Sequence, residues 1–285
     1  MQIELIDTFL DLLETNSFNR TADRMGVTQS TVSARLVALE QVLGARLFTR
    51  SRAGTQLSTE GLKFEAHARL IRQDWTRARR AVGEQGTAAL ALYLGIQNDL
   101  SAAYLGDLVA DFRRVLPETA FYVEPDYSTQ MCTDLVSGQA DFAVMFTPKP
   151  HPDLYFASAG EIPYRLIASE GATLADLRPE RYVLANFSPL FAAAHRQLLP
   201  SLSVAPLSVG QSTAVAGLLQ SMGGAGYVMQ VTAETMVAEG RFRFIKDAPV
   251  IRQPVYAASH VRDRISNLHK LLQRTVQARF AHLSP

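Results

Sequence analysis

Residues 18–44 read FNRTADRMGVTQSTVSARLVALEQVLG, and their pattern decides the fold of the N-terminal region. Apolar residues on one face predict a short helix over 18–25, and Gly26 supplies the left-handed conformation that commonly ends a helix. Thr28 is a good N-cap for a second helix, whose apolar residues repeat along one face: Val32, Leu36, Leu39 and Leu43. Two short helices around a tight turn with glycine are typical of a helix-turn-helix that offers its second helix to the DNA major groove.

The side chains opposite that apolar stripe are small or polar. Hydroxyls and amides bond base edges or phosphates, and Arg35 is long enough for a guanine edge or a phosphate. The free N–H groups at the start of the helix also favour phosphate. We therefore expect DNA contacts at Thr28, Gln29, Ser30, Thr31, Ser33 and Arg35.

Residues 47–57, LFTRSRAGTQL, predict a β-hairpin wing with Arg50 and Arg52 near its tip. These two arginines are expected to contact the DNA backbone or the minor groove. The formal net charge of the 285-residue chain is only +1, but residues 15–59 hold six arginines against two acidic residues. This local excess of positive charge suits a surface that faces phosphate, although an ordinary solvated face would explain the excess equally well.

Two further helices flank this region. Apolar residues at spacings of three and four predict one amphipathic helix over 2–15. Ser58 is expected to cap a second helix that runs to about residue 85 and spans roughly 40 Å. Its apolar flank requires a partner surface, unless the helix is only a spacer between domains. The candidate dimerisation residues are Leu62, Ala66, Leu70, Trp75, Ala78 and Val82, and residues 85–87 are the expected hinge.

About sixty residues in register resemble the N-terminal signature of LysR-type transcription regulators. The matching positions are Phe18-Asn19-Arg20-Thr21-Ala22, Val27-Thr28-Gln29-Ser30, Val32-Ser33, Leu39-Glu40, Leu43-Gly44, Leu47-Phe48, Arg50, Leu57-Ser58 and Gly61. Two positions depart from the pattern, because Thr21 stands where alanine is commoner and Ala34 stands where many members carry arginine. The run Ser33–Leu36 and the pair Asp74-Trp75 also look like the HdfR subgroup.

The resemblance implies how such a chain assembles and responds. Family members pair the long helix antiparallel with that of a second subunit, and dimers assemble further into a homotetramer. A small-molecule effector would change the angle between the DNA-binding pairs and thereby DNA bending and the access of RNA polymerase. The expected partners are therefore double-stranded operator DNA, further copies of the chain, an effector and RNA polymerase.

From residue 87 onward strands and helices alternate, which predicts parallel α/β structure. We expect a winged helix-turn-helix over 1–58, a linker helix over 59–86 and a regulatory domain over 87–285. The regulatory domain is expected to contain two Rossmann-like subdomains in a periplasmic-binding-protein-like fold, the first over about 87–160 and 255–285 and the second over about 161–254. The expected strands are 90–96, 120–124, 141–146, 165–168, 182–186, 203–208, 226–229 and 254–258, and the expected helices are 101–116, 131–137, 212–222 and 265–280.

Ligands of such domains bind at the carboxyl ends of strands, beside helix N-termini. Hydroxyls, amides and aromatic rings at these ends suit a small polar organic molecule, and Asp99 and Asp126 disfavour a plain dicarboxylate. The alternative is that these residues are ordinary loop caps and that the domain binds no small molecule. The candidate effector-binding residues are Gln97, Asn98, Asp99, Ser101, Tyr127, Ser128, Thr129, Phe146, Thr147, Ser188, Gln211, Ser212 and Gly226.

Other classes of protein find little support in the sequence. The single cysteine, Cys132, excludes an intramolecular disulfide and fits a core or near-cleft thiol in a reducing compartment. The six histidines lack metal-binding spacing, and no nucleophile elbow or dinucleotide fingerprint is found. We expect no metal, cofactor or catalytic residue, and hence no enzyme. The N-terminus does not resemble a signal peptide, no apolar stretch is long enough to span a membrane, and we expect a cytoplasmic protein.

The sequence therefore predicts a DNA-binding transcription regulator controlled by an effector in the cleft between the regulatory subdomains. One alternative is a DNA-binding regulator that responds to a protein partner or to no ligand. Another is a cytoplasmic small-molecule-binding α/β protein whose N-terminal helices only dimerise it.

Overall fold

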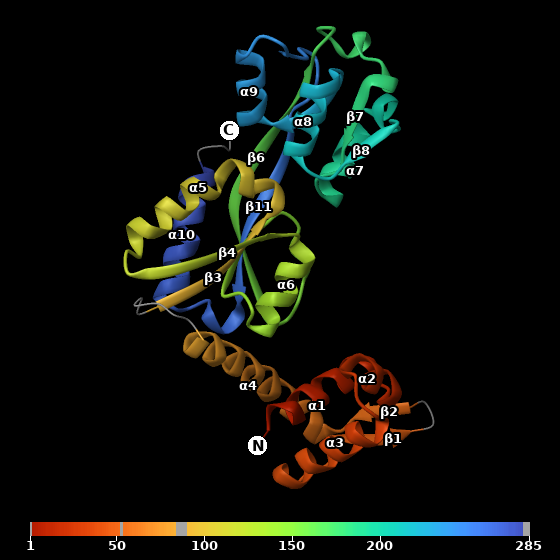
Figure 1. Cartoon of the computed structure of the whole chain (residues 1–285), viewed down its shortest axis with the longest axis vertical. Coiled ribbons are helices and arrows are strands. Elements are labelled where there is room, and N and C mark those ends of the chain that lie inside the picture. The colour runs from red at the N-terminus through yellow and green to blue at the C-terminus, as the bar shows by residue number, and fades with distance from the viewer. Residues whose placement is uncertain (1, 52–53, 84–89, 282–285) are drawn as a thin grey trace. The chain divides into compact units, whose positions relative to one another are not determined.

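The computed structural model describes residues 2–51, 54–83 and 90–281 and divides the chain into two compact units, residues 1–86 with 136–139 and the remainder. Arg52 and the expected hinge at 85–87 lie outside the described residues. The N-terminal part of the first unit, residues 2–83, is drawn from red to light orange in Figure 1. Its elements are α1 (Ile3–Thr15), α2 (Phe18–Met25), α3 (Gln29–Leu43), β1 (Phe48–Ser51), β2 (Gly54–Leu57) and α4 (Thr59–Gly83).

The helix ends in the first unit lie where local sequence signals predict them. Gly26 and Gly44 adopt φ of 65° and 67° and end α2 and α3. Ser58 accepts a hydrogen bond from the Gly61 amide at 2.9 Å at the start of α4. The core is aromatic where the helices meet the hairpin, because Phe9 packs 5.5 Å from Phe48, ring centre to ring centre. The expected helix-turn-helix and wing are confirmed.

The second unit alternates strands and helices. Its strands are β3 (Leu90–Gln97), β4 (Thr119–Asp126), β5 (Phe142–Met145), β6 (Leu154–Ala168), β7 (Tyr182–Ala185), β8 (Leu207–Val209), β9 (Ala225–Met229), β10 (Arg243–Phe244) and β11 (Ile251–His260). Its α-helices are α5 (Asn98–Val115), α6 (Ser128–Ser137), α7 (Pro189–Leu198), α8 (Ser212–Met222), α9 (Gln230–Ala238) and α10 (Asn267–Ala281). Single 3-10 turns occur at Leu174–Asp176, Pro179–Arg181, Pro200–Leu202 and Val261–Asp263.

One mixed sheet runs through this unit in the order β4-β3-β5-β11-β6-β9-β7-β8, with β10 paired to β6. As expected, β3 is parallel to β4 and β5 at one end, and β7 is parallel to β8 and β9 at the other. We call the first end subdomain I, with α5, α6 and α10, and the second end subdomain II, with α7, α8 and α9. The long antiparallel pair β6–β11 joins the two ends (Figure 1).

The expected strands at 165–168 and 254–258 were therefore too short. Gly160 and Pro163 interrupt the hydrophobic alternation of 154–168 and suggest a loop before residue 165. In the structure, Gly160 adopts φ of 128° inside β6, close to the backbone of Phe280, and the register of β6 against β11 shifts between Val255 and Tyr256. A glycine and a bulge thus bend the long strand instead of ending it.

Several helices also differ from expectation. α5 begins at Asn98 and not at Ser101, and the Ser101 hydroxyl donates to the Asn98 carbonyl from inside the helix instead of capping it. α6 begins at Ser128 and not at residue 131, and α7 and α9 were not expected. The earlier starts bring the ends of β3 and β4 directly onto helix N-termini.

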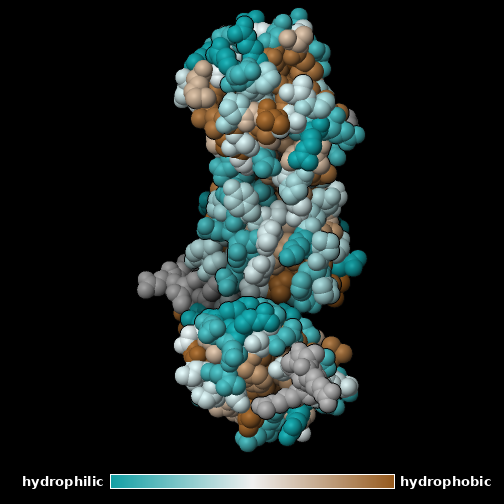
Figure 2. All heavy atoms as spheres, turned by 90° about the vertical axis from the view of Figure 1, so that its right-hand side faces the viewer, coloured by the Kyte–Doolittle hydropathy of each residue, from teal (hydrophilic) through white to brown (hydrophobic). Residues whose placement is uncertain are grey.

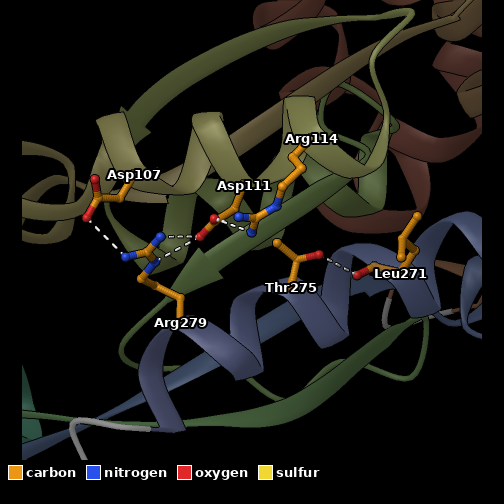
Figure 3. Close-up of polar contacts among 6 residues, drawn as sticks. All are labelled: Asp107, Asp111, Arg114, Leu271, Thr275 and Arg279. Carbon is orange, nitrogen blue, oxygen red and sulfur yellow. Dashed lines mark hydrogen bonds and ion pairs between the residues drawn. The ribbon is translucent and has the colours of Figure 1, made fainter.

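Subdomain I is closed on its outer side by α5 and α10. Arg279 of α10 donates to Asp111 and lies 3.1 Å from Asp107, and Arg114 lies 2.7 Å from Asp111 (Figure 3). Beneath these ion pairs the rings of Tyr104 and Phe280 meet at 5.3 Å. The contacts fix α5 by its middle and carboxyl end, and so position the N-terminus of α5 at the edge of the sheet.

Apolar side chains reach the surface of subdomain II. Figure 2 shows hydrophobic areas on the end of the second unit that holds α7 and β8. The exposed apolar residues of this subdomain include Leu190, Leu198, Val204 and Met222. No described helix of the chain has the length and hydrophobicity needed to cross a membrane.

Candidate functional site

The first candidate site is the amino end of α3. The Thr28 hydroxyl accepts the Thr31 amide at 3.2 Å, as an N-cap, and contacts the hydroxyls of Ser30 and Thr31 at 2.8 Å. Gln29 and Ser30 are exposed at the same end of the helix. Unpaired N–H groups at the start of a helix attract a phosphate, and the surrounding hydroxyls can turn to bond a phosphate or a base.

The outward face of α3 is uncharged. Ser30, Ala34, Val37 and Gln41 follow one another at helical spacing and are all exposed, with Val37 at 47 %. α3 lies wholly within the described part of the chain, and none of its exposed side chains carries a charge. Such a face can hydrogen-bond bases through Ser30 and Gln41, and can touch a thymine methyl group through Ala34 and Val37.

Arg35 lies on a different side of α3. Its Nη1 atom is 3.5 Å from the hydroxyl of Thr8 in α1, and the side chain is half-buried. Ser33 is half-buried as well and lines the concavity between α3 and the hairpin. The structure therefore separates Arg35 from the exposed face formed by Ser30, Ala34, Val37 and Gln41, while Ser33 remains beside that face.

A concavity of about 850 Å³ lies between α3 and the hairpin, lined in part by Val37, Gln41, Arg46, Thr49 and Thr55. It continues the outward face of α3 onto the wing. Arg46 is exposed there and adds a cation that sequence reasoning did not select, although it falls within the arginine-rich stretch. The side chain of Arg50 lies outside the described part of the structure.

The flank of α4 expected to dimerise is largely exposed. The side chains of Leu62, Trp75 and Val82 are 64 %, 48 % and 88 % exposed, and Ala66 and Ala78 are exposed too, whereas Leu70 is half-buried. The other flank packs on the first unit through Phe64, Ala68 and Ile71. A helix with one packed and one exposed apolar flank has the surface of an interface helix.

The second candidate site lies where subdomains I and II meet. The carboxylate of Asp99, at the start of α5, accepts the backbone amide of Ser212 at 2.5 Å and the hydroxyl of Tyr164. Ser212 is the first residue of α8, and its own hydroxyl accepts the Met229 amide at 2.9 Å. Burial raises the pKa of Asp99 to about 6, against the opposing effect of these two hydrogen bonds.

Two further polar groups fill the same region. The Ser128 hydroxyl donates to the Gln97 side-chain oxygen at 2.8 Å and accepts the Thr147 amide at 3.1 Å. The Ser188 hydroxyl, which caps α7, donates to the Gln253 side-chain oxygen at 2.5 Å. Among the described residues, nothing bonds the buried hydroxyl of Thr147.

The structure brings together about half of the expected effector-binding residues. Gln97, Asp99, Ser128, Thr147, Ser188 and Ser212 contribute to this polar cluster, which is mostly buried. Other members have their side chains exposed, half-buried or packed in the core: Asn98, Ser101, Tyr127, Thr129, Phe146 and Gln211. Gly226 is buried against the backbone of Val183 and the side chain of Val215.

Sequence reasoning missed Tyr164 and Gln253. Both lie on the β6–β11 pair, one residue before the strand starts expected at 165 and 254. Recognising the long strands would have placed both side chains at the junction of the subdomains.

Cys132 is a buried thiol with its sulfur 3.9 Å from that of Met145, and burial raises its pKa. Within the described ranges, no three His, Cys, Asp or Glu side chains gather as a metal site would require. The structure thus offers two candidate sites, the uncharged outward face of α3 and the polar cluster around Asp99.

The two regions that contain these candidate sites match models of one family. Residues 3–62 match the family described as "Bacterial regulatory helix-turn-helix protein, lysR family", and residues 85–281 match "LysR substrate binding domain". The transcriptional regulator HdfR of Yersinia pestis is 26 % identical over 267 residues, 90 % of each chain. The regulator AlsR of Bacillus subtilis is 26 % identical over 193 residues, which is 63 % of each chain.

Solved structures agree on the fold. ArgP of Mycobacterium tuberculosis superposes with a TM-score of 0.60 at 21 % identity, covering 98 % of this chain and 97 % of its own. LysG of Corynebacterium glutamicum, solved with a bound effector Arg, superposes with a TM-score of 0.59 at 17 % identity over the full length of both chains.

Proposed function

The chain belongs to the lysR family of bacterial helix-turn-helix regulators, and we propose that it reads an operator as a dimer through α3 and the wing. It is a LysR-type transcription regulator with an effector-binding domain, and its curated relatives are transcription regulators. The observation that carries the proposal is the exposed face of α3, which lies beside an open concavity shared with the wing.

Readout would combine two kinds of contact. The free N–H groups of α3, Arg46 and the wing arginines Arg50 and Arg52 would bind phosphates, which gives affinity without sequence preference. The uncharged face of α3 would read bases, with Ser30 and Gln41 as hydrogen-bonding groups and Ala34 and Val37 against thymine methyl groups. Arg35, directed toward α1, would support the helix or reach a flanking phosphate.

Assembly would use the apolar surfaces that the monomer leaves exposed. The 25-residue helix α4 is roughly 38 Å long and presents Leu62, Trp75 and Val82 to a second subunit. We propose the domain limits 1–58, 59–86 and 87–285, with the linker helix as the dimer interface. The exposed apolar residues of subdomain II would take part in assembling a tetramer.

The polar cluster around Asp99 is the proposed effector site, because it lies at strand ends and helix N-termini shared by both subdomains. LysG, of the same fold, was solved with a bound effector Arg, which supports a small polar ligand as the general type. Binding would change the angle between the two DNA-binding units of a dimer, and so DNA bending and contact with RNA polymerase. A regulator of this kind acts where the chromosome is, so we propose a cytoplasmic location.

One observation favours a second candidate, a regulator that needs no small molecule. The residues of the junction already bond one another, through Asp99 with Ser212 and Ser188 with Gln253. A protein partner would then control the DNA-bound protein. A thermal-shift screen of metabolites separates the two candidates, since only the first predicts a specific stabilising ligand.

The test of the proposed function is a footprint of the full-length chain on DNA upstream of its own gene. Two protected half-sites about one helical turn apart, or a multiple of it, are expected from a dimeric reader. Arg46→Ala should reduce the salt dependence of binding by about one phosphate contact. Arg274→Ala is the matched control, because it removes an exposed arginine from α10. Equal salt slopes for both variants would remove Arg46 from the interface, and no specific binding to any fragment of the genome would refute operator recognition.

A further inference from the structure

Asp99 joins the two subdomains through a carboxylate. It belongs to subdomain I, at the start of α5, whereas the amide that it accepts belongs to Ser212 at the start of α8 in subdomain II. The second donor, Tyr164, lies on β6, one of the two strands shared by both subdomains. Asp99 is 3 % exposed and Ser212 is 1 % exposed, so the contact is closed to water.

The donors around Asp99 form an anion-binding arrangement. The first amide of a helix has no partner within the helix, and the helix dipole favours negative charge at that point. The hydroxyl of Ser212 is already used by the Met229 amide, which holds the start of α8 in place. A phenol hydroxyl and a helix N–H that converge on one point are what a carboxylate from a ligand would seek.

A carboxylate of the chain itself occupies that point, and it is not there to form an ion pair. Burial is the main cause of the raised pKa of Asp99, and no cation among the described residues contributes to that shift. A buried carboxylate without a neighbouring cation lowers the stability of the folded protein. Such destabilising ionisable groups are typical of functional sites. The Ser188–Gln253 bond joins α7 of subdomain II to the shared strand β11, whereas the bonds of Ser128 lie within subdomain I.

We propose that Asp99 is a built-in substitute for an anionic effector. The carboxylate of Asp99 binds the α8 N-terminus and Tyr164, and so holds the subdomains together without an added ligand. The inference rests on the proposed function of the polar cluster around Asp99 as the effector site. It also sets the class of ligand, because a second carboxylate cannot share these two donors with Asp99. A natural effector of this chain is therefore neutral or cationic where it approaches Asp99.

The proposal predicts that removing the Asp99 side chain creates an anion site. In the full-length Asp99→Ala variant, sodium acetate should raise the melting temperature in a saturable way, at constant ionic strength with chloride as the balancing anion. Wild-type protein should show no saturable rise, because its donors are occupied. Should Asp99→Ala fail to fold, Asp99→Ser with formate is the substitute, since serine leaves room for the smaller anion.

Three controls separate this site from general effects of acetate. Leu108→Ala opens a cavity at a fully buried position of the same helix and should not respond saturably. Asp99→Asn fills the space with a neutral side chain and should not respond. Adding Tyr164→Phe to Asp99→Ala should weaken acetate binding by about 10- to 100-fold, because one hydrogen bond to a charged group is lost.

The outcomes are distinct from those of the operator test. A saturable response of wild-type protein equal to that of Asp99→Ala, or no response of the alanine and serine variants, overturns the role of Asp99 even if the chain binds its operator. Conversely, acetate binding by Asp99→Ala supports the built-in anion even if no operator is found. In that case operator recognition is refuted, whereas the proposed role of the Asp99 carboxylate still stands.

Discussion

Replacing Asp99 by asparagine should remove a large part of the pH dependence of stability. The pKa of Asp99 rises from 3.8 to about 6 in the folded chain, chiefly through burial. The folded state therefore holds this proton more tightly than the unfolded state. The resulting stabilisation is complete below the unfolded value of 3.8 and is lost as pH rises through about 6.

The size of the effect follows from the shift. A difference of roughly two pKa units corresponds to about 3 kcal/mol at ~1.36 kcal/mol per unit. Asparagine stays neutral at every pH. The free energy of unfolding of Asp99→Asn minus that of wild type should therefore increase by about 2–3 kcal/mol from pH ~4 to pH ~7.5.

The assay is urea unfolding of both proteins at several pH values, because the other carboxylates cancel in the difference. Asp107→Asn, which removes a largely exposed carboxylate from the same helix, controls for the loss of a charge from α5. A constant difference between Asp99→Asn and wild type across this pH range would contradict the buried, cation-free carboxylate on which the reasoning depends.

Three other predictions test other parts of the molecule. Arg279→Met should lower the free energy of unfolding by about 1–3 kcal/mol in urea, since the largely buried Asp111 loses its α10 partner; an unchanged midpoint would deny the ion pair a structural role. Replacing thymine by deoxyuridine in an operator half-site should weaken wild-type binding by about 0.8 kcal/mol per methyl contact in gel shifts, and Val37→Ser should be less sensitive to the same replacement. Trp75→Glu should shift the chain toward monomer in light scattering, whereas an unaltered mass would exclude this flank of α4 from the interface.

The first unit was predictable because its signals are local. The Thr28 cap bonds an amide three residues away, and Gly26 ends α2 through its own backbone conformation. The apolar period of α3 fixes which side is buried, and with it the exposure of Ser30 and Ala34. The same period predicted Arg35 opposite the apolar stripe, whereas in the structure its half-buried side chain turns toward Thr8 of α1.

The sequence by itself determined the helix-turn-helix, the alternation of strands and helices, and the presence of polar side chains at the strand ends. Only the tertiary structure decided that Asp99 bonds Tyr164 and Ser212, which lie 65 and 113 residues further along the chain. It also decided that β6 and β11 run on through Gly160 and Pro254 as one antiparallel pair. The physical reason is range: a cap or a period is encoded within a few residues, whereas strand register and a bond between subdomains depend on how distant segments pack.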